Sequence, residues 1–115
     1  MKILNANSHG IIDYAVVLFL WLSPSIFELS NYVSMLTYGL GCVHLALTAF
    51  TNFKYGLVKL IPFRSHGWIE LVVSIVLIGS PWILGFSEVS VDRIFYVGFG
   101  AAVFVTWLFT DYDLG

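Results

Sequence analysis

The sequence predicts an all-α polytopic membrane protein with four transmembrane helices, built from two tandem helical hairpins. Of its 115 residues, 59% are hydrophobic and only 10% are charged, with a mean hydropathy of +0.91. A soluble domain usually has about 25% charged residues and cannot hide so much apolar surface from water. The apolar residues form four continuous runs, and the polar residues of the first two runs recur in the last two. The composition therefore predicts spans, and the recurrence predicts a repeat.

The four runs are close to the length of about 17–25 residues that a membrane helix needs. They cover approximately residues 10–27, 32–50, 67–86 and 94–109. The intervals between them hold the turn-forming residues and nearly all of the charge. Because each run is continuously apolar and not alternating, the pattern favours helices over barrel strands. Only Lys2 precedes the first run, Asp13 interrupts it, and no small-residue cleavage site closes it, so we expect no secretory signal.

The first and third runs open with the same motif. Ser8-His9-Gly10 and Ser65-His66-Gly67 lie 57 positions apart, and an acid follows each histidine by four residues, as Asp13 and Glu70. Both runs end near a Ser-Pro pair. We therefore expect one transmembrane domain, residues 1–115, with repeats at about 8–56 and 65–115. Two spans per repeat make both copies enter from the same side, which predicts a pseudo-two-fold axis along the membrane normal.

The second and fourth runs match after a shift to 59 positions. Phe50-Thr51-Asn52-Phe53 corresponds to Phe109-Thr110-Asp111-Tyr112. The paired glycines also correspond, and small residues let membrane helices approach closely, so we expect them at packing contacts. They are Gly39, Gly41, Gly98 and Gly100.

Lysine and arginine predict the orientation. Lys2, Lys54, Lys59 and Arg64 lie on the side of the N-terminus and the middle loop, and only Arg93 lies on the other side. Positive residues favour the cytoplasmic side, so both termini are expected in the cytoplasm.

Histidine and acid at positions i and i+4 share one helix face, so His9 with Asp13 and His66 with Glu70 are predicted to form a polar cluster. Such groups inside a membrane normally face the bundle interior. The leading interpretation is a structural clasp in which the pairs satisfy one another. A proton or cation site is the second interpretation, and a metal or haem site is the third, since two histidines and two carboxylates could surround a metal.

Each hairpin returns to the membrane face where it began. Asn52 and Asp111, at the ends of the second and fourth runs, are therefore expected within reach of the histidines. We predict pairs of His66 with Asp111 and of His9 with Asn52. His44 lies mid-span with no counterpart in the repeat, where an interhelical hydrogen bond is the first interpretation and a ligand or proton carrier the second.

The Ser-Pro pairs have a structural interpretation. Pro24 and Pro81 each remove a helical N–H and free the carbonyl four residues earlier, at Leu20 and Leu77, which the preceding Ser23 and Ser80 can rebond locally. Trp82 follows the second Ser-Pro pair directly, and we group it with these structural motif residues. A catalytic serine would need a nearby base, and the outer loops contain no histidine, so no catalytic residue is proposed.

These motifs resemble the SPW repeat membrane proteins, named for a Ser-Pro-Trp motif in the first of two transmembrane helices of each repeat. Ser80-Pro81-Trp82 with Leu84-Gly85-Phe86 matches the motif in full, whereas the first copy reads Ser23-Pro24-Ser25 and lacks the tryptophan. His9-Gly10 with Asp13-Tyr14, and Thr110-Asp111-Tyr112 with Leu114-Gly115, also match. The resemblance covers nearly the whole chain and implies a small prokaryotic integral membrane protein, located in the plasma membrane, of uncharacterised activity.

The leading functional interpretation is a non-enzymatic structural, accessory or oligomeric membrane component that needs no cofactor. A small proton or cation channel or transporter is second, and a haem- or metal-binding redox protein is third. The chain has no nucleotide-binding loop, and its single Cys42 excludes an internal disulfide or a CxxC pair. The expected partner is the lipid bilayer, with a second copy or another membrane protein as a further partner. No basic stripe points to nucleic acid.

Overall fold

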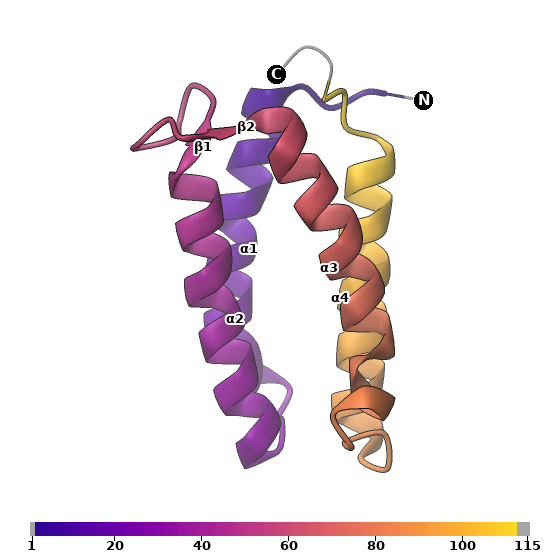
Figure 1. Ribbon diagram of the computed structural model, residues 1–115. Helices are drawn as coiled ribbons and strands as arrows, with labels where there is room; N and C mark the ends of the chain where they lie inside the picture. The colour runs from indigo at the N-terminus through magenta and orange to yellow at the C-terminus, as the bar shows by residue number, and fades with distance from the viewer. Residues whose placement is uncertain (1, 113–115) are drawn as a thin grey trace.

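The computed structural model describes residues 2–112 and contains four long helices (Figure 1). The helices are α1 (Ala6–Ile26), α2 (Asn31–Ala49), α3 (Phe63–Ile83) and α4 (Ser90–Leu108). Two short strands, β1 (Thr51–Asn52) and β2 (Ile61–Pro62), lie between α2 and α3. All four helices are long and apolar enough to cross a membrane. The four predicted spans are therefore confirmed, in the order of two consecutive hairpins.

The first and third helices begin earlier than the apolar runs indicated. The side chain of Asn5 caps α1 by accepting a hydrogen bond from the Ser8 backbone N–H at 2.8 Å. Helix α3 begins directly after Pro62. As a result His9 and His66 lie inside the first turns of α1 and α3, where a rigid helix fixes the direction of each side chain.

Glycines set the distance between the two helices of each hairpin. A Cβ on Gly41 of α2 would lie 2.5 Å from the Trp21 indole nitrogen of α1. A Cβ on Gly100 of α4 would lie 2.9 Å from the Ile78 backbone nitrogen of α3. The predicted packing role is thus confirmed for these two glycines. Among the described residues, Gly39 and Gly98 have no such neighbour within 4 Å.

The two proline residues lie inside the last turns of α1 and α3. The Ser80 hydroxyl donates to the Leu77 carbonyl at 2.7 Å, which is the carbonyl that Pro81 frees, as predicted. In the first repeat the Ser23 hydroxyl donates to the Phe19 carbonyl instead of to Leu20. The Ser-Pro pairs therefore shape helix ends, and only the second pair rebonds the freed carbonyl.

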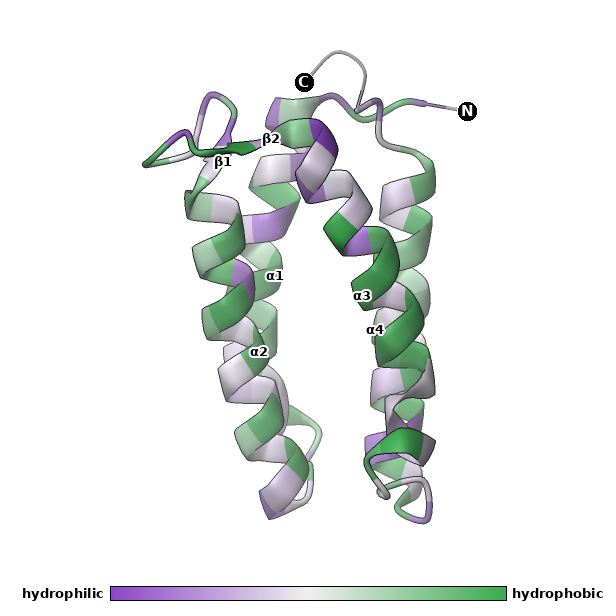
Figure 2. Cartoon of the chain, viewed as in Figure 1, coloured by the Kyte–Doolittle hydropathy of each residue, from purple (hydrophilic) through white to green (hydrophobic). Residues whose placement is uncertain are grey.

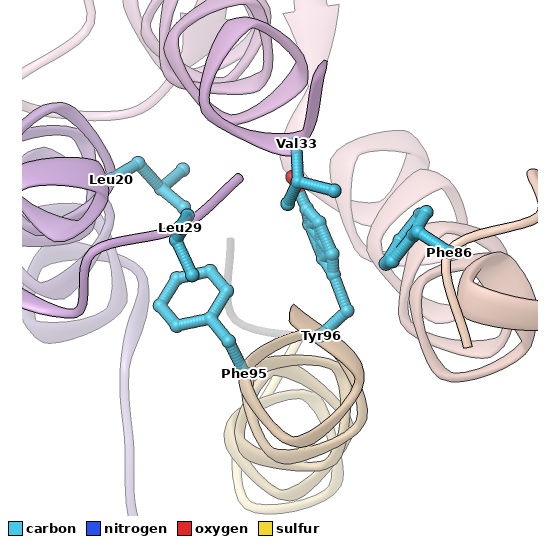
Figure 3. Packing of buried hydrophobic residues seen from close by; sticks show 6 residues of the cluster. All are labelled: Leu20, Leu29, Val33, Phe86, Phe95 and Tyr96. Atoms are coloured by element: carbon cyan, nitrogen blue, oxygen red, sulfur yellow. The ribbon is translucent and has the colours of Figure 1, made fainter. Parts of the chain in front are cut away.

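The hairpins meet in an apolar core at the end of the bundle away from β1 and β2. Figure 3 shows side chains of this core converging from both hairpins. They are Leu20, Leu29, Val33, Phe86, Phe95 and Tyr96. The Tyr96 hydroxyl adds a polar link across it, since it lies 2.6 Å from the Thr37 hydroxyl of the other hairpin. This core ties α4 to α1 and α2.

At the opposite end, short backbone pairings cross between the repeats. Thr51 pairs with Ile61 in parallel, and Leu4 pairs in parallel with Thr110. These positions correspond in the repeat alignment, so equivalent residues make equivalent contacts. The contacts are compatible with the expected pseudo-two-fold relation, and the axis itself stays a prediction. Hydropathy predicts only a polar interval between the second and third runs, because two-residue strands leave no hydropathy pattern.

The outer surface is apolar. Leu18, Met35 and Val72 are among many exposed large hydrophobic residues, with 60%, 75% and 60% of their surface exposed. Figure 2 shows predominantly hydrophobic helices, with hydrophilic segments of α1 and α3 near the end that carries β1 and β2. A surface of this kind is stable in lipid, not in water.

A buried histidine and carboxylate cluster as the candidate site

The four predicted ionisable residues of α1 and α3 come together in the interior. His9, Asp13, His66 and Glu70, here named the His–acid cluster, are between 0% and 4% exposed. One ligand atom from each lies within 4.8 Å of the other three. The cluster sits near the end of the bundle that carries β1 and β2, opposite the apolar core. The two repeats therefore contribute equally to one site.

Each acid lies closer to the histidine of the other repeat than to its own. His9 Nε2 is 2.6 Å from Glu70 Oε2 and 3.3 Å from Asp13 Oδ2. His66 Nε2 is 3.0 Å from Asp13 Oδ2 and 3.6 Å from Glu70 Oε1. The i and i+4 contacts expected from the sequence are present, but the shortest contacts cross from one hairpin to the other.

Two threonines hold the other ring nitrogens. His9 Nδ1 lies 2.7 Å from the Thr110 hydroxyl, and His66 Nδ1 lies 2.7 Å from the Thr51 hydroxyl. Each hydroxyl donates its only proton to a helix carbonyl at 2.6 Å, Thr110 to Thr106 and Thr51 to Leu47. Each hydroxyl must therefore accept from the histidine, so both Nδ1 atoms carry hydrogen.

This tautomer leaves the Nε2 atoms without a proton of their own when the rings are neutral. A lone pair would then face a carboxylate oxygen, and the two would repel. Among residues 2–112, His9 Nε2, His66 Nε2 and Asp13 Oδ2 are buried and none has a hydrogen bond of suitable direction, despite the short distances. The arrangement therefore requires a cation, either protons or a metal ion, between the rings and the acids.

The donor set suits a divalent metal ion. Nitrogen from two histidines and oxygen from two carboxylates are ligands that zinc and its first-row neighbours accept. Tetrahedral metal–ligand bonds of about 2.0–2.2 Å would place donors about 3.3–3.6 Å apart. Binding an ion would therefore lengthen the 2.6 Å contact between His9 and Glu70 and shorten the widest separations, which lie within 4.8 Å. The threonine contacts are also the kind of outer hydrogen bond that orients metal-binding histidines.

Aromatic rings cover the cluster. Each ring packs against the glycine that follows a histidine in the His-Gly motif. The Phe53 ring occupies the space of a Cβ on Gly10, and the Tyr112 ring occupies that space on Gly67. The Tyr112 hydroxyl lies 3.1 Å from Glu70 Oε2. Burial, and then the nearby Glu70 carboxylate, raise the pKa of the Tyr112 phenol. The phenol therefore stays protonated, and its O–H group donates a hydrogen bond to the Glu70 carboxylate.

The other predicted polar residues occupy different places. Asn52 is exposed, and the Asp111 backbone N–H donates to the Leu4 carbonyl at 2.8 Å. The hydroxyl partners of the histidines are Thr51 and Thr110, one position earlier in the chain. Each threonine belongs to the repeat that does not supply its histidine, whereas the sequence reading paired each histidine within its own repeat.

His44 joins the edge of the cluster from α2. Its Nε2 lies 3.4 Å from Asp13 Oδ1 and is buried without a hydrogen bond among the described residues. The motif residues Ser23, Pro24, Ser80 and Pro81 are buried, and Trp82 is 60% exposed. They lie at the far ends of α1 and α3, so they do not belong to the His–acid cluster.

Sequence reasoning missed two kinds of buried polar residue. Thr51 and Thr110 were visible as matched repeat positions, but only the charged or amide neighbour of each was singled out. Asp92, at the first turn of α4, is 0% exposed and accepts a hydrogen bond from the Ser30 backbone N–H at 3.1 Å. It has no repeat counterpart, so the repeat gave no signal for it.

The fold and the cluster together define a multi-pass helical membrane protein made of two linked hairpins with a buried polar site. Residues 7–110 match the SPW repeat domain, and the chain belongs to this family. The resemblance found in its motifs is thereby confirmed. No curated protein and no solved structure matches the chain.

Proposed function

We propose that this small integral membrane protein binds one divalent first-row metal ion in the His–acid cluster, and that the ion clasps the two hairpins together. The role is structural and not enzymatic. The observation that carries the proposal is the pair of buried Nε2 atoms, fixed as lone-pair donors by Thr51 and Thr110 and facing two carboxylates. A closed set of four protein ligands is typical of structural metal sites.

Charge balance supports the same assignment. Two neutral histidines, two carboxylates and one divalent ion sum to zero, which limits the cost of burial at the edge of the membrane. Two imidazolium rings with two carboxylates also sum to zero. Protons and one metal ion are therefore interchangeable occupants of the cluster, and the structural clasp held by protons is the competing assignment.

The second candidate function is transport of protons or cations through the cluster. The cluster has zero net charge both with two added protons and with one divalent ion. One occupant can therefore replace the other, as transport would require. The cavities that adjoin the cluster are lined chiefly by apolar side chains from all four helices. An ion would lose its ligands on leaving Glu70 for this region, which favours a bound ion over a conducted one.

Cobalt binding tests the proposal. Purified protein is stripped with EDTA and titrated with Co²⁺, whose visible absorption reports its ligands. We expect one Co²⁺ per chain, displaced by Zn²⁺, and binding lost in Asp13→Asn and His66→Gln. The matched control is Asp92→Asn, which changes a buried acid at the other end of the bundle and is expected to keep the site.

Proton release provides a measurement on the unaltered protein. Metal ions replace the protons of their ligands, so near neutral pH we expect about two protons released per ion bound, measured calorimetrically in buffers of different ionisation enthalpy. A wild-type protein that binds neither Co²⁺ nor Zn²⁺ would overturn the proposal and leave the proton-held clasp. A metal- or pH-driven flux in liposomes that disappears in His66→Gln would favour transport.

We propose in addition that the His–acid cluster faces the cytoplasm from a prokaryotic plasma membrane. The excess of Lys and Arg on the side of the middle loop supports this orientation. The family resemblance supports a prokaryotic cell as the source of this membrane. We propose a second copy or another membrane protein as a further partner. The apolar outer surface supports this, because another protein can cover it as lipid does.

A further inference from the structure

An apolar cavity lies between the two hairpins, directly beside the His–acid cluster. Its volume is about 130 Å³, and side chains of all four helices line it, among them Leu20, Leu77, Phe99 and Val103. A smaller cavity of about 50 Å³ shares Phe99 and Val103 with it. A cavity of roughly 150 Å³ with such a lining holds a benzene ring in a protein interior. The space therefore fits a ring-sized apolar group.

Two polar side chains interrupt this lining, and both line both cavities. They are His44 of α2 and Glu70 of α3. His44 Nε2 is buried without a hydrogen bond among the described residues, and the Glu70 side chain is 6% exposed. Other lining residues of the larger cavity are apolar. A ligand here would meet hydrogen-bonding groups at one end only, where the cavity borders the cluster.

We propose that this cavity binds a membrane-dissolved phenol, a ring with one hydroxyl at its polar end and an apolar body. The hydroxyl donates to the Glu70 carboxylate and accepts from the His44 imidazole, which supplies the partner that His44 Nε2 lacks among the described residues. The phenol site shares Glu70 with the proposed metal site, so its test uses metal-free protein.

The chemistry of the two groups excludes close relatives of this ligand. An ether or a ketone oxygen only accepts hydrogen bonds, so it would face the Glu70 carboxylate with no proton to offer. A fatty acid would bring a second carboxylate beside Glu70 and be repelled. A plain acyl chain would fill the cavity but leave His44 unsatisfied, which is costly inside a membrane. Selectivity for a hydroxyl is therefore the signature of the proposed site.

The test compares 4-butylphenol with its methyl ether, 4-butylanisole, by calorimetric titration of the EDTA-treated protein in lipid nanodiscs. We expect the phenol to bind at least about tenfold more tightly than the ether, since one hydrogen bond to a charged group is lost. His44→Leu should remove most of this preference. A larger residue in the cavity, Val73→Phe, should abolish binding, and Val72→Phe on the lipid-facing side of the same helix is the matched control.

Helix content and the elution profile of each variant show that it is folded, so a misfolded Val73→Phe cannot imitate the expected result. Equal affinity of wild-type protein for the phenol and the ether would overturn the proposal and leave an acyl-chain cavity. Equal binding by Val73→Phe and Val72→Phe would overturn it as well. A nanodisc mass of two chains, reduced to one by Val73→Phe, would instead assign the cavity to a second copy. None of these results depends on Co²⁺ binding, which tests the metal site separately.

Discussion

At the scale of single residues, Thr51 and Thr110 determine what the histidines can do. Each hydroxyl donates a hydrogen bond to a helix carbonyl and accepts one from a ring Nδ1–H. The rings then present Nε2 to the two carboxylates. A serine or threonine at this position therefore controls the tautomer of a histidine in the other repeat, although it never touches an acid.

Removing one hydroxyl should show this control. Thr51→Val keeps the shape but leaves the His66 Nδ1–H buried without an acceptor, which we expect to lower the free energy of unfolding by about 1–3 kcal/mol. Metal affinity should fall by about 10- to 100-fold, as for other outer hydrogen bonds. Denaturant unfolding in detergent and Co²⁺ titration measure the two effects.

The matched control is Thr48→Val, because Thr48 is equally buried and its hydroxyl donates to the His44 carbonyl within the same helix. Thr51→Ser restores the hydroxyl and should recover metal binding. If Thr51→Val and Thr48→Val behave alike, the assigned tautomer is wrong.

At the scale of helices, glycine and proline determine the shape of each hairpin. Gly41 and Gly100 occupy corresponding repeat positions, and each brings its helix against the first helix of its own hairpin. Gly39 and Gly98 precede them by two positions and therefore lie on a different side of the same helices. The repeated Gly-x-Gly motif therefore contains one packing position and one open position in each copy.

A single methyl group should distinguish these positions. In Gly100→Ala the new Cβ would meet the Ile78 backbone, which cannot swing away as a side chain can, so we expect a loss of about 1–3 kcal/mol from forced separation of α3 and α4. Gly98→Ala meets nothing within 4 Å and should be neutral or stabilise by up to about 1 kcal/mol through helix propensity. Equal stabilities in detergent unfolding would contradict the packing role of Gly100.

At the scale of the whole molecule, the two hairpins are joined at both ends by different chemistry. Apolar side chains join them at one end, and the His–acid cluster with its backbone pairings joins them at the other. The apolar cavity lies between these two contacts. If the cluster binds metal as proposed, we expect exchange of protons for an ion to change how firmly the hairpins are held at this end, with the apolar core unchanged.

The orientation can be checked on intact cells. In a Cys42→Ala background, Ser87→Cys in the α3–α4 loop should react with a membrane-impermeant maleimide, because positive residues hold the N-terminus and the middle loop inside. A cysteine at Lys54 should react only after the cells are opened. The reverse labelling pattern would contradict cytoplasmic termini.

Hydropathy and the repeat were sufficient to predict the four spans and their order, which the structure confirms. Hydropathy reports burial in lipid over some twenty residues, and a repeat shows which side chains serve matching places. Helical spacing puts His9 with Asp13 and His66 with Glu70 on one face each, and the structure brings these four side chains together. Spacing along one helix could not predict the surroundings of Asn52, Asp111 and His44, which depend on neighbouring segments.

The choice of partners between the two repeats follows from the packing of the hairpins against each other. The exchange of partners, with Thr51 serving His66 and Thr110 serving His9, depends on how two hairpins are set against each other. Hydropathy and spacing describe one helix at a time and carry no information on that relation. The tautomer of the histidines, the cavity beside Glu70 and the buried Asp92 all arise from contacts between segments far apart in the chain, so they required the packed molecule.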